Sequence, residues 1–169
     1  MKILVINLSL RPRPARRWLP IGLGYVASAM KRAGFKFDLL DLDATSQPPE
    51  ETEEFLRTHS YDVVAMGCIV TGYKHVKRFS KAIRTAFPDT VIIAGNTVAQ
   101  SITQILLTKT EVDIAVIGEG ENTIVELLET LPNSKNLKNI DGICYKENGN
   151  ITKNKPREVI KDIDEIPSP

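Results

Sequence analysis

Residue types that usually carry catalysis are sparse and scattered in this sequence. The chain has two cysteines, Cys68 and Cys144, and two histidines, His59 and His75. These residues show no spacing typical of a metal site, and two cysteines give no disulfide framework. The acidic residues provide no pair of carboxylates placed for general acid–base catalysis. We therefore do not expect this chain to be catalytic by itself.

Small residues gather instead where strands are predicted to end. Residues 112–131 read VDIAVIGEGENTIVELLETL, an apolar run followed by Gly118, Gly120 and then apolar residues at helical spacing. This pattern predicts a buried strand, a glycine turn and a helix. In open parallel sheets such turns lie at the carboxyl edge, where ligands bind. An ordinary connection that needs glycine only for its backbone geometry would give the same pattern.

Other loops predicted at this edge support a ligand site. Residues 68–73 (CIVTGY) and 95–98 (GNTV) are small, so a broad ligand can lie close to the backbone there. The first loop, residues 9–19, is long and rich in arginine and proline. Loops of such length in compact domains are often functional. His59 is expected at the opposite, amino edge, and His75 in the first turn of a helix near the crevice.

Five alternations of strand and helix are predicted to position these loops. The expected strands are residues 2–8, 35–42, 63–67, 90–95 and 113–117. A single helix is expected over residues 96–107, between the last two strands. Such alternation predicts a three-layer α/β fold with a five-stranded parallel sheet. Right-handed crossovers favour the flavodoxin-like, or Rossmann-like, strand order 2-1-3-4-5.

The chain divides into three predicted parts. Residues 1–132 form the α/β domain. Residues 133–155 form a small β-hairpin appendage, because two apolar runs flank a turn-forming ENGN sequence. Residues 156–169 carry three prolines and no periodic apolar pattern. We expect them to be a linker without a partner of its own in this chain, leading toward an absent domain.

Composition narrows the class of protein. The chain has 169 residues, 42% of them hydrophobic and 25% charged, with a net charge of +1 at pH 7. These values are typical of a globular protein and give no indication of a nucleic-acid partner. The apolar runs fall short of the ~20 residues of a membrane span. The first residues resemble an opening strand more than a signal peptide, so we predict a cytoplasmic protein.

The order of motifs resembles a known family. A strand and a long loop lead to PIGLGY, followed by YDVVAMG, PDTVIIAGN, VDIAVIGEGENTIVELLETL, IDGICYKENGNI and DIDEIPSP. This order resembles the N-terminal cobalamin (B12)-binding domain of B12-dependent radical S-adenosylmethionine enzymes, which include methyltransferases and cyclases. The resemblance covers essentially the whole chain. The CxxxCxxC motif of the radical domain is missing here, so the resemblance implies one domain of a longer enzyme.

The resemblance implies cobalamin as the cofactor of this domain, bound at the carboxyl edge. S-adenosylmethionine and a 4Fe-4S cluster would bind only in the downstream radical domain, which is the expected partner. The implied cobalamin-binding residues are Leu19, Pro20, Gly22, Cys68, Ile69, Val70, Thr71, Gly95, Asn96, Thr97, Val98, Gly118, Glu119 and Gly120.

Two departures from related cobalamin domains bear on the expected binding mode. Domains of the methionine-synthase type carry D-x-H-x-x-G after the first strand, and that histidine ligates cobalt. The corresponding loop here has no histidine, so the resemblance implies base-off cobalamin without a protein imidazole. The fourth loop usually reads G-G-P-H in the radical family, and here residues 95–98 read GNTV.

Two other interpretations remain open from the sequence. The chain could be a degenerate domain of this fold that binds no cobalamin and serves in substrate binding or interaction. It could also be a nucleotide- or sugar-binding α/β domain. A change in the absorbance spectrum of hydroxocobalamin on addition to the protein would distinguish a cobalamin-binding domain from both of these alternatives.

Overall fold

The computed structural model describes residues 1–8, 20–132, 136–162 and 166–169. The long first loop, residues 9–19, lies outside the described residues. The predicted site residue Leu19 therefore lies outside them too.

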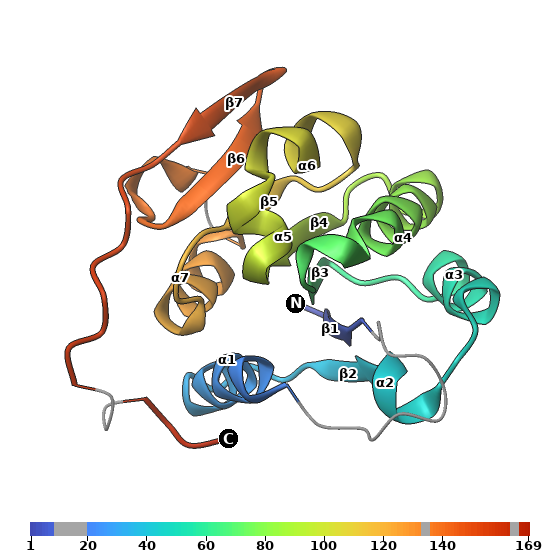
Figure 1. Ribbon diagram of the computed structural model, residues 1–169, viewed down its shortest axis with the longest axis horizontal. Helices are drawn as coiled ribbons and strands as arrows, with labels where there is room; N and C mark the ends of the chain where they lie inside the picture. The colour runs from blue at the N-terminus through green and yellow to red at the C-terminus, as the bar shows by residue number, and fades with distance from the viewer. Residues whose placement is uncertain (9–19, 133–135, 163–165) are drawn as a thin grey trace.

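A sheet with strand order β2-β1-β3-β4-β5-β6-β7 forms the centre of the described structure (Figure 1). Strands β1 to β5 pair in parallel, and β6 and β7 continue the sheet in antiparallel pairing. The predicted α/β fold, the order 2-1-3-4-5 and the C-terminal hairpin are confirmed. The strands are β1 (Ile3–Asn7), β2 (Asp38–Asp41), β3 (Val63–Gly67), β4 (Val91–Gly95), β5 (Ile114–Val116), β6 (Ile143–Glu147) and β7 (Asn150–Lys153).

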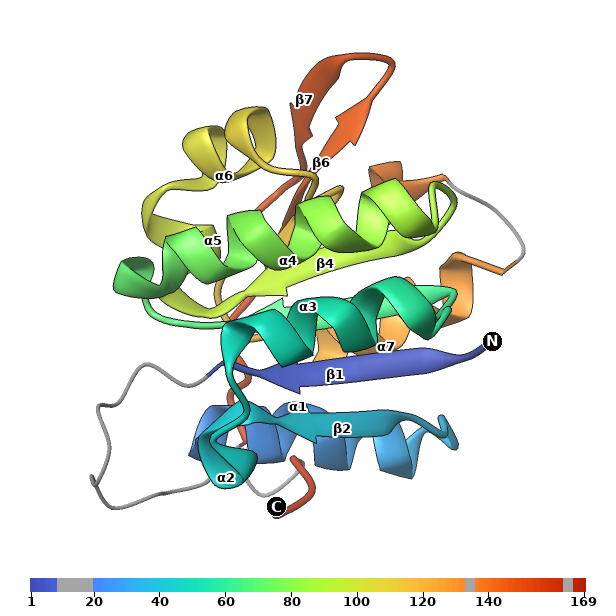
Figure 2. The ribbon, with the colours of Figure 1, turned by 90° about the vertical axis from the view of Figure 1, so that its right-hand side faces the viewer.

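Helices cover both faces of the sheet, which makes three layers (Figures 1 and 2). One face packs against α1 (Ile21–Arg32) and α7 (Glu121–Thr130). The other face packs against α3 (Pro49–Thr58), α4 (Tyr73–Ala86), α5 (Asn96–Ser101) and α6 (Thr103–Lys109). Shorter turns are α2 (Leu42–Thr45), η1 (Val70–Gly72) and η2 (Leu137–Asn139). Within the described ranges, no helix is long and apolar enough to cross a membrane.

Burial on both faces explains the continuous apolar runs of the parallel strands. In β1, Ile3 and Val5 belong to the apolar cluster with α1 and α7, whereas Leu4 and Ile6 belong to the cluster on the opposite face. Each of these four side chains is at most 2% exposed. Successive residues of a strand point to opposite faces, so a strand buried on both sides has no polar alternation.

Two predicted elements differ from the structure. The second strand, expected over residues 35–42, begins only at Asp38 and ends at Asp41. Oδ1 of Asp41 accepts hydrogen bonds from the backbone N–H groups of Asp43 and Ala44 at 3.0 Å. This side-chain cap starts α2 at once. The helix expected over residues 96–107 is two helices, because Ile102 has a non-helical backbone with φ −132° and ψ 35°.

The segment after β7 is bonded to the domain. Arg157 donates hydrogen bonds to the carboxylate of Glu126, and the backbone N–H of Ile160 donates to Oε2 of Glu119 at 3.0 Å. The expectation that residues 156–169 have no partner in this chain is wrong at these positions. One arginine and a backbone group hold the segment, and neither produces the apolar periodicity that sequence reasoning relies on.

Candidate functional site

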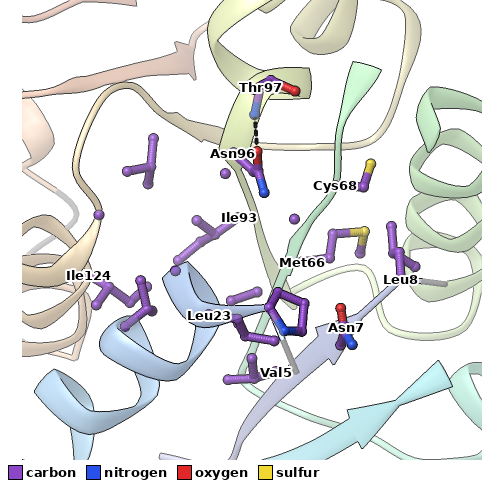
Figure 3. A pocket seen from close by; sticks show the side chains of 18 of the residues that line it. Val5, Asn7, Leu8, Leu23, Met66, Cys68, Ile93, Asn96, Thr97 and Ile124 are labelled. Atoms are coloured by element: carbon purple, nitrogen blue, oxygen red, sulfur yellow. Dashed lines mark hydrogen bonds between the residues drawn. The ribbon is translucent and has the colours of Figure 1, made fainter. Parts of the chain in front are cut away.

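A cleft of about 690 Å³ opens at the carboxyl edge, between the sheet and helices α1 and α7 (Figure 3). Its inner surface is apolar. Strand residues Val5, Ile93 and Val116 line it, together with Leu23 of α1 and Ile124 of α7. The volume falls within the ~300–1,000 Å³ typical of small-molecule sites. The cleft therefore suits a ligand with a sizeable apolar part.

Glycines at the strand ends keep the rim of the cleft open. Gly67 and Gly95 end β3 and β4, and Gly118 follows β5. A Cβ atom added to Gly95 or Gly118 would meet no other atom within 4 Å. Gly118 also has a φ of 83°, a conformation that residues with a side chain rarely adopt. Bare backbone thus borders the space that a ligand would fill.

The turn between β4 and α5 brings polar side chains to the same rim. Asn96 has a φ of 66°, and its Oδ1 accepts a hydrogen bond from the backbone N–H of Thr97 at 2.6 Å. Asparagine is among the few side chains that tolerate this left-handed conformation. Asn96 therefore adopts a conformation that usually favours glycine. Asn96 and Thr97 are both exposed and line the cleft, as Figure 3 shows.

A buried polar group marks the end of β1. Asn7 is 4% exposed and lines the cleft, and its Nδ2 donates to Oδ1 of Asp41 at 2.8 Å. Asp43, also buried, lines the cleft nearby. Asn7 is not among the site residues predicted from the sequence. Its position, a polar residue at the end of an apolar strand, could have indicated a place in the cleft lining. These groups give the apolar cleft a polar border on the β1 side.

The acidic turn after β5 provides carboxylates at the opposite border. Glu119 and Glu121 both line the cleft. Oε2 of Glu121 is buried and has no hydrogen-bond partner among the described residues. A buried acceptor without a donor is costly. The carboxylate of Glu121 is therefore suited to accept a hydrogen bond from an N–H or O–H group of a bound ligand.

Cys68 lines the cleft as a buried thiol. Its burial raises the pKa of the thiol to about 11. The thiol is therefore protonated at neutral pH, which makes it a poor nucleophile. Cys68 contributes a small apolar surface, close to Met66 in Figure 3.

The two histidines lie away from the cleft lining. His75 is half-buried on α4, and burial, followed by the charges of Lys74 and Arg78, lowers its pKa. His59 stacks on Phe55 of α3 with ring centroids 4.2 Å apart, ahead of β3 and thus at the amino edge, as expected. In the part of the chain that is described, no three His, Cys, Asp or Glu residues gather as a metal site.

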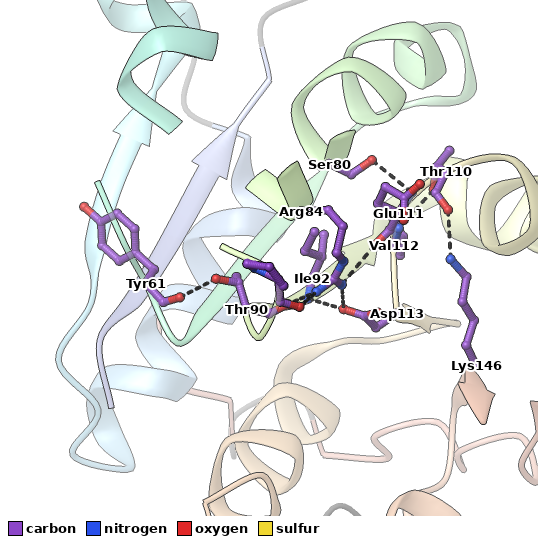
Figure 4. A network of polar contacts seen from close by, with 11 residues as sticks. Tyr61, Ser80, Arg84, Thr90, Ile92, Thr110, Glu111, Val112, Asp113 and Lys146 are labelled. Atoms are coloured by element: carbon purple, nitrogen blue, oxygen red, sulfur yellow. Dashed lines mark hydrogen bonds and ion pairs between the residues drawn. The ribbon is translucent and has the colours of Figure 1, made fainter. Parts of the chain in front are cut away.

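A second polar network lies at the amino edge, where β4 and β5 begin (Figure 4). Arg84 of α4 donates to the carbonyl oxygen of Thr90 at 2.9 Å and to Oδ2 of Asp113 at 2.6 Å. The same Oδ2 accepts the backbone N–H of Ile92 at 2.8 Å. These bonds tie α4 to the starts of two strands. The network is structural, since its carboxylate and carbonyl oxygens accept hydrogen bonds from the Arg84 guanidinium and from a backbone N–H within the network.

Most predicted cofactor-binding residues line the cleft, although a cofactor role for them stays a prediction. Those in the lining are Pro20, Gly22, Cys68, Ile69, Gly95, Asn96, Thr97, Gly118, Glu119 and Gly120. Val70 and Thr71 are exposed in η1 and do not belong to the lining. Val98 is fully buried and donates its backbone N–H to the carbonyl oxygen of Cys68 at 3.1 Å.

Sequence reasoning missed the wall of the cleft formed by helices. Leu23, Val26 and Met30 of α1 and Ile124 of α7 line it. Helical spacing of apolar residues indicates only that one face of a helix is apolar, and it does not reveal that two helices leave a gap above the sheet. The packing of α1 beside α7 is what creates this wall.

Curated relatives match nearly the whole chain. It is 27% identical over 151 residues to an uncharacterized methyltransferase of Pyrococcus horikoshii, covering 89% of this chain and 33% of the relative. It is 28% identical over 174 residues to the anaerobic magnesium-protoporphyrin IX monomethyl ester cyclase of Synechocystis. That match covers 97% of this chain and 34% of the relative. The chain spans about a third of the length of these relatives.

Solved structures share the fold. The radical S-adenosylmethionine methyltransferase TsrM from Kitasatospora setae, with cobalamin and a [4Fe-4S] cluster bound, superposes with a TM-score of 0.77 at 16% identity. The match covers 99% of this chain and 31% of TsrM. The cobalamin-dependent S-adenosylmethionine radical enzyme OxsB, with aqua-cobalamin and S-adenosylmethionine bound, gives a TM-score of 0.79 at 19% identity. That match covers 94% of this chain and 22% of OxsB.

The family description that matches this chain is the B12 binding domain, over residues 13–128. That range includes the ends of β3, β4 and β5 and the glycine turns of the cleft, whereas β1 precedes it. It also includes α1 and residues 121–128 of α7, the helices that form the cleft's wall. The chain belongs to the B12-binding domain family.

Proposed function

We propose that this chain binds cobalamin in the cleft between the sheet and helices α1 and α7. The cofactor is bound base-off, with no histidine of this chain on cobalt. The observation that carries the proposal is the cleft itself, apolar inside and bordered by bare glycine backbone, in a chain of the B12-binding domain family. When bound, cobalamin supplies methyl-transfer or one-electron chemistry at cobalt.

The apolar interior of the cleft and its glycine-lined rim fit different parts of cobalamin. The apolar gap lined by Val5, Ile93 and Leu23 suits the flat base of the displaced nucleotide tail. The rim at Gly95 and Gly118 allows a broad ring to lie close to the backbone. Polar side chains such as Asn96, Thr97 and Glu121, together with their backbone, suit the amide groups around the ring.

The proposal extends to a longer chain. We propose that a radical S-adenosylmethionine domain, with its own S-adenosylmethionine and 4Fe-4S cluster, is the partner of this domain in a methyltransferase or cyclase. This is supported by the resemblance of the motifs and by the fold shared with TsrM and OxsB. The reading frame beyond Pro169 tests it, because a CxxxCxxC motif should follow within the next domain.

Titration with hydroxocobalamin tests the binding proposal directly. We expect saturable binding to this chain, seen as a change in the cobalamin absorbance spectrum and as cofactor retained on gel filtration. A chain that neither shifts the spectrum nor retains the cofactor would refute the proposal. That outcome would favour a degenerate domain of this fold or a nucleotide- or sugar-binding domain.

A further inference from the structure

Residues 155–160, here called the strap, run alongside α7 on the way from β7 toward α1 (Figure 1). Arg157 is the central residue of the strap. Its Nη1 and Nη2 donate to the two carboxylate oxygens of Glu126 at 3.2 and 2.5 Å, and its Nη2 also donates to the carbonyl oxygen of Asp141 at 3.2 Å. The Arg157 side chain is 16% exposed. Two-pronged arginine–carboxylate pairs of this kind are strong and directional.

Bonds from the strap reach the turn that lines the cleft. Nε of Arg157 donates to Oγ1 of Thr123 at 2.7 Å, and that hydroxyl donates to the carbonyl oxygen of Glu119 at 3.4 Å. Farther along the strap, the backbone N–H of Ile160 donates to Oε2 of Glu119 at 3.0 Å. Thr123 is fully buried. The strap therefore holds both the backbone and the side chain of Glu119, a residue of the cleft lining.

Packing around Gly142 fixes the strap from its other side. The N–H of Gly142 donates to the carbonyl oxygen of Lys155 at 2.8 Å, and its own carbonyl oxygen accepts the N–H of Ile117 at 2.8 Å. A Cβ atom on Gly142 would lie 3.1 Å from Cβ of Arg157 and 3.2 Å from the carbonyl oxygen of Ile117. The strap, the start of the hairpin and the end of β5 are thus in close contact at one point.

We propose that Arg157 is a positioning residue for the cleft, acting through Thr123 and Glu119. The strap holds residues 118–121 in the conformation that lines the cleft. Cofactor affinity then depends on a segment that contributes no residue to the cleft lining. The inference rests on the proposed function for its effect on cobalamin, while its effect on the turn is independent of any ligand.

The test compares Arg157→Met with Arg84→Met. Both changes remove an arginine bonded to a carboxylate and to carbonyl groups, but Arg84 lies at the amino edge. Without cofactor, Arg157→Met should speed amide exchange across residues 118–124 by about tenfold, given the strength of charge-assisted bonds. The Kd for hydroxocobalamin should rise by a similar factor. Arg84→Met should lower the Tm yet leave both quantities within twofold of the wild type.

A second variant, Glu126→Gln, controls for the case in which Arg157→Met does not fold. Glu126→Gln keeps the shape of the side chain and the buried Thr123 bond, so it should change exchange and Kd in the same direction by a smaller factor. The proposal is overturned if residues 118–124 exchange at the wild-type rate in both strap variants. A wild type that binds no cobalamin refutes the proposed function instead, since the exchange measurement needs no cofactor.

Discussion

Gly67 and Gly95 stand side by side at the ends of β3 and β4, because the register of the parallel sheet pairs them directly. A Cβ atom on Gly67 would lie 3.5 Å from the carbonyl oxygen of Gly95, in ordinary contact. A Cβ atom on Gly95 would meet nothing within 4 Å. Of the two neighbours, Gly95 is therefore the one that borders open space, and it offers the cleaner test of the cleft.

Replacement of Gly95 by tryptophan should fill the cleft with little damage to the fold. Gly95 has an extended backbone, φ −131° and ψ −169°, which other residues also adopt. We expect Gly95→Trp to weaken hydroxocobalamin binding at least tenfold, about 1.4 kcal/mol or more, with an unchanged far-UV circular dichroism spectrum. Gly118→Trp should also weaken binding at least tenfold, but it should lower the Tm as well, because φ is 83° there.

The matched control is Lys109→Trp, which places the same side chain at the exposed end of α6, outside the cleft lining. Its affinity for hydroxocobalamin should equal that of the wild type. Full affinity in both glycine variants would place the cofactor site elsewhere on the molecule.

The left-handed backbone of Asn96 predicts a difference between two small substitutions. Asn96→Ala should lower the free energy of unfolding by about 1 kcal/mol or more, since a φ of 66° is unfavourable for alanine. Asn96→Gly should be close to neutral, because glycine adopts this conformation without a steric penalty. Urea unfolding of both variants measures the difference. Equal stabilities would show that the β4–α5 turn relaxes to another conformation.

Burial of Cys68 predicts a loss of stability at alkaline pH. The folded state raises the pKa of this thiol from 9.0 to about 11. Between these values the unfolded chain releases the proton and the folded chain keeps it, so the free energy of unfolding should fall as the pH rises from about 9 to 11. The contribution is fully present below pH 9. Urea unfolding from pH 8 to 11 measures the decline.

A Cys68→Ala variant provides the control for this titration. Its unfolding free energy should decline less steeply over the same range, because the thiol no longer contributes. Identical slopes in the wild type and the variant would mean that Cys68 keeps an ordinary pKa in the folded protein.

Arg84 should contribute to stability and not to ligand binding. Its bonds join α4 to Thr90 and Asp113 at the edge opposite the cleft. Arg84→Met should lower the free energy of unfolding by about 1.5–3 kcal/mol, the usual contribution of hydrogen bonds to charged groups. Urea unfolding measures the loss. A change below about 0.5 kcal/mol would indicate that solvent replaces these bonds at little cost.

The sheet could be predicted from the sequence because its strands are unusually clear. Runs such as 63–66 and 114–117 are apolar without alternation, which is what burial on both faces requires. The glycines that follow them, Gly67 and Gly118, marked the carboxyl edge and with it most of the cleft rim. Local pattern was sufficient for these features because each depends on neighbours in the sequence.

Features formed between distant segments could not be predicted in this way. The helical wall of the cleft depends on the packing of α1 beside α7 above the sheet, which neither helix encodes alone. The strap depends on Arg157 meeting Glu126, 31 residues away in the sequence. Single polar pairs over such separations leave no periodic signal. The end of β2 could be predicted more easily from local sequence. Aspartate is a common helix cap, and Asp41 caps α2 directly after the strand.

The absence of histidine from the cleft lining predicts the spectrum of bound Co(II) cobalamin. His75 lies on α4, which packs against the opposite face of the sheet from α1 and α7. His59 is stacked on Phe55 at the amino edge, and the first loop contains no histidine. With the cofactor's own base displaced, cobalt should carry water or no lower ligand. Electron paramagnetic resonance should then show no nitrogen superhyperfine splitting, in the wild type as in His75→Ala. A splitting that is present in the wild type and lost in His75→Ala would show that this helix reaches the cofactor and that the proposed binding mode is wrong.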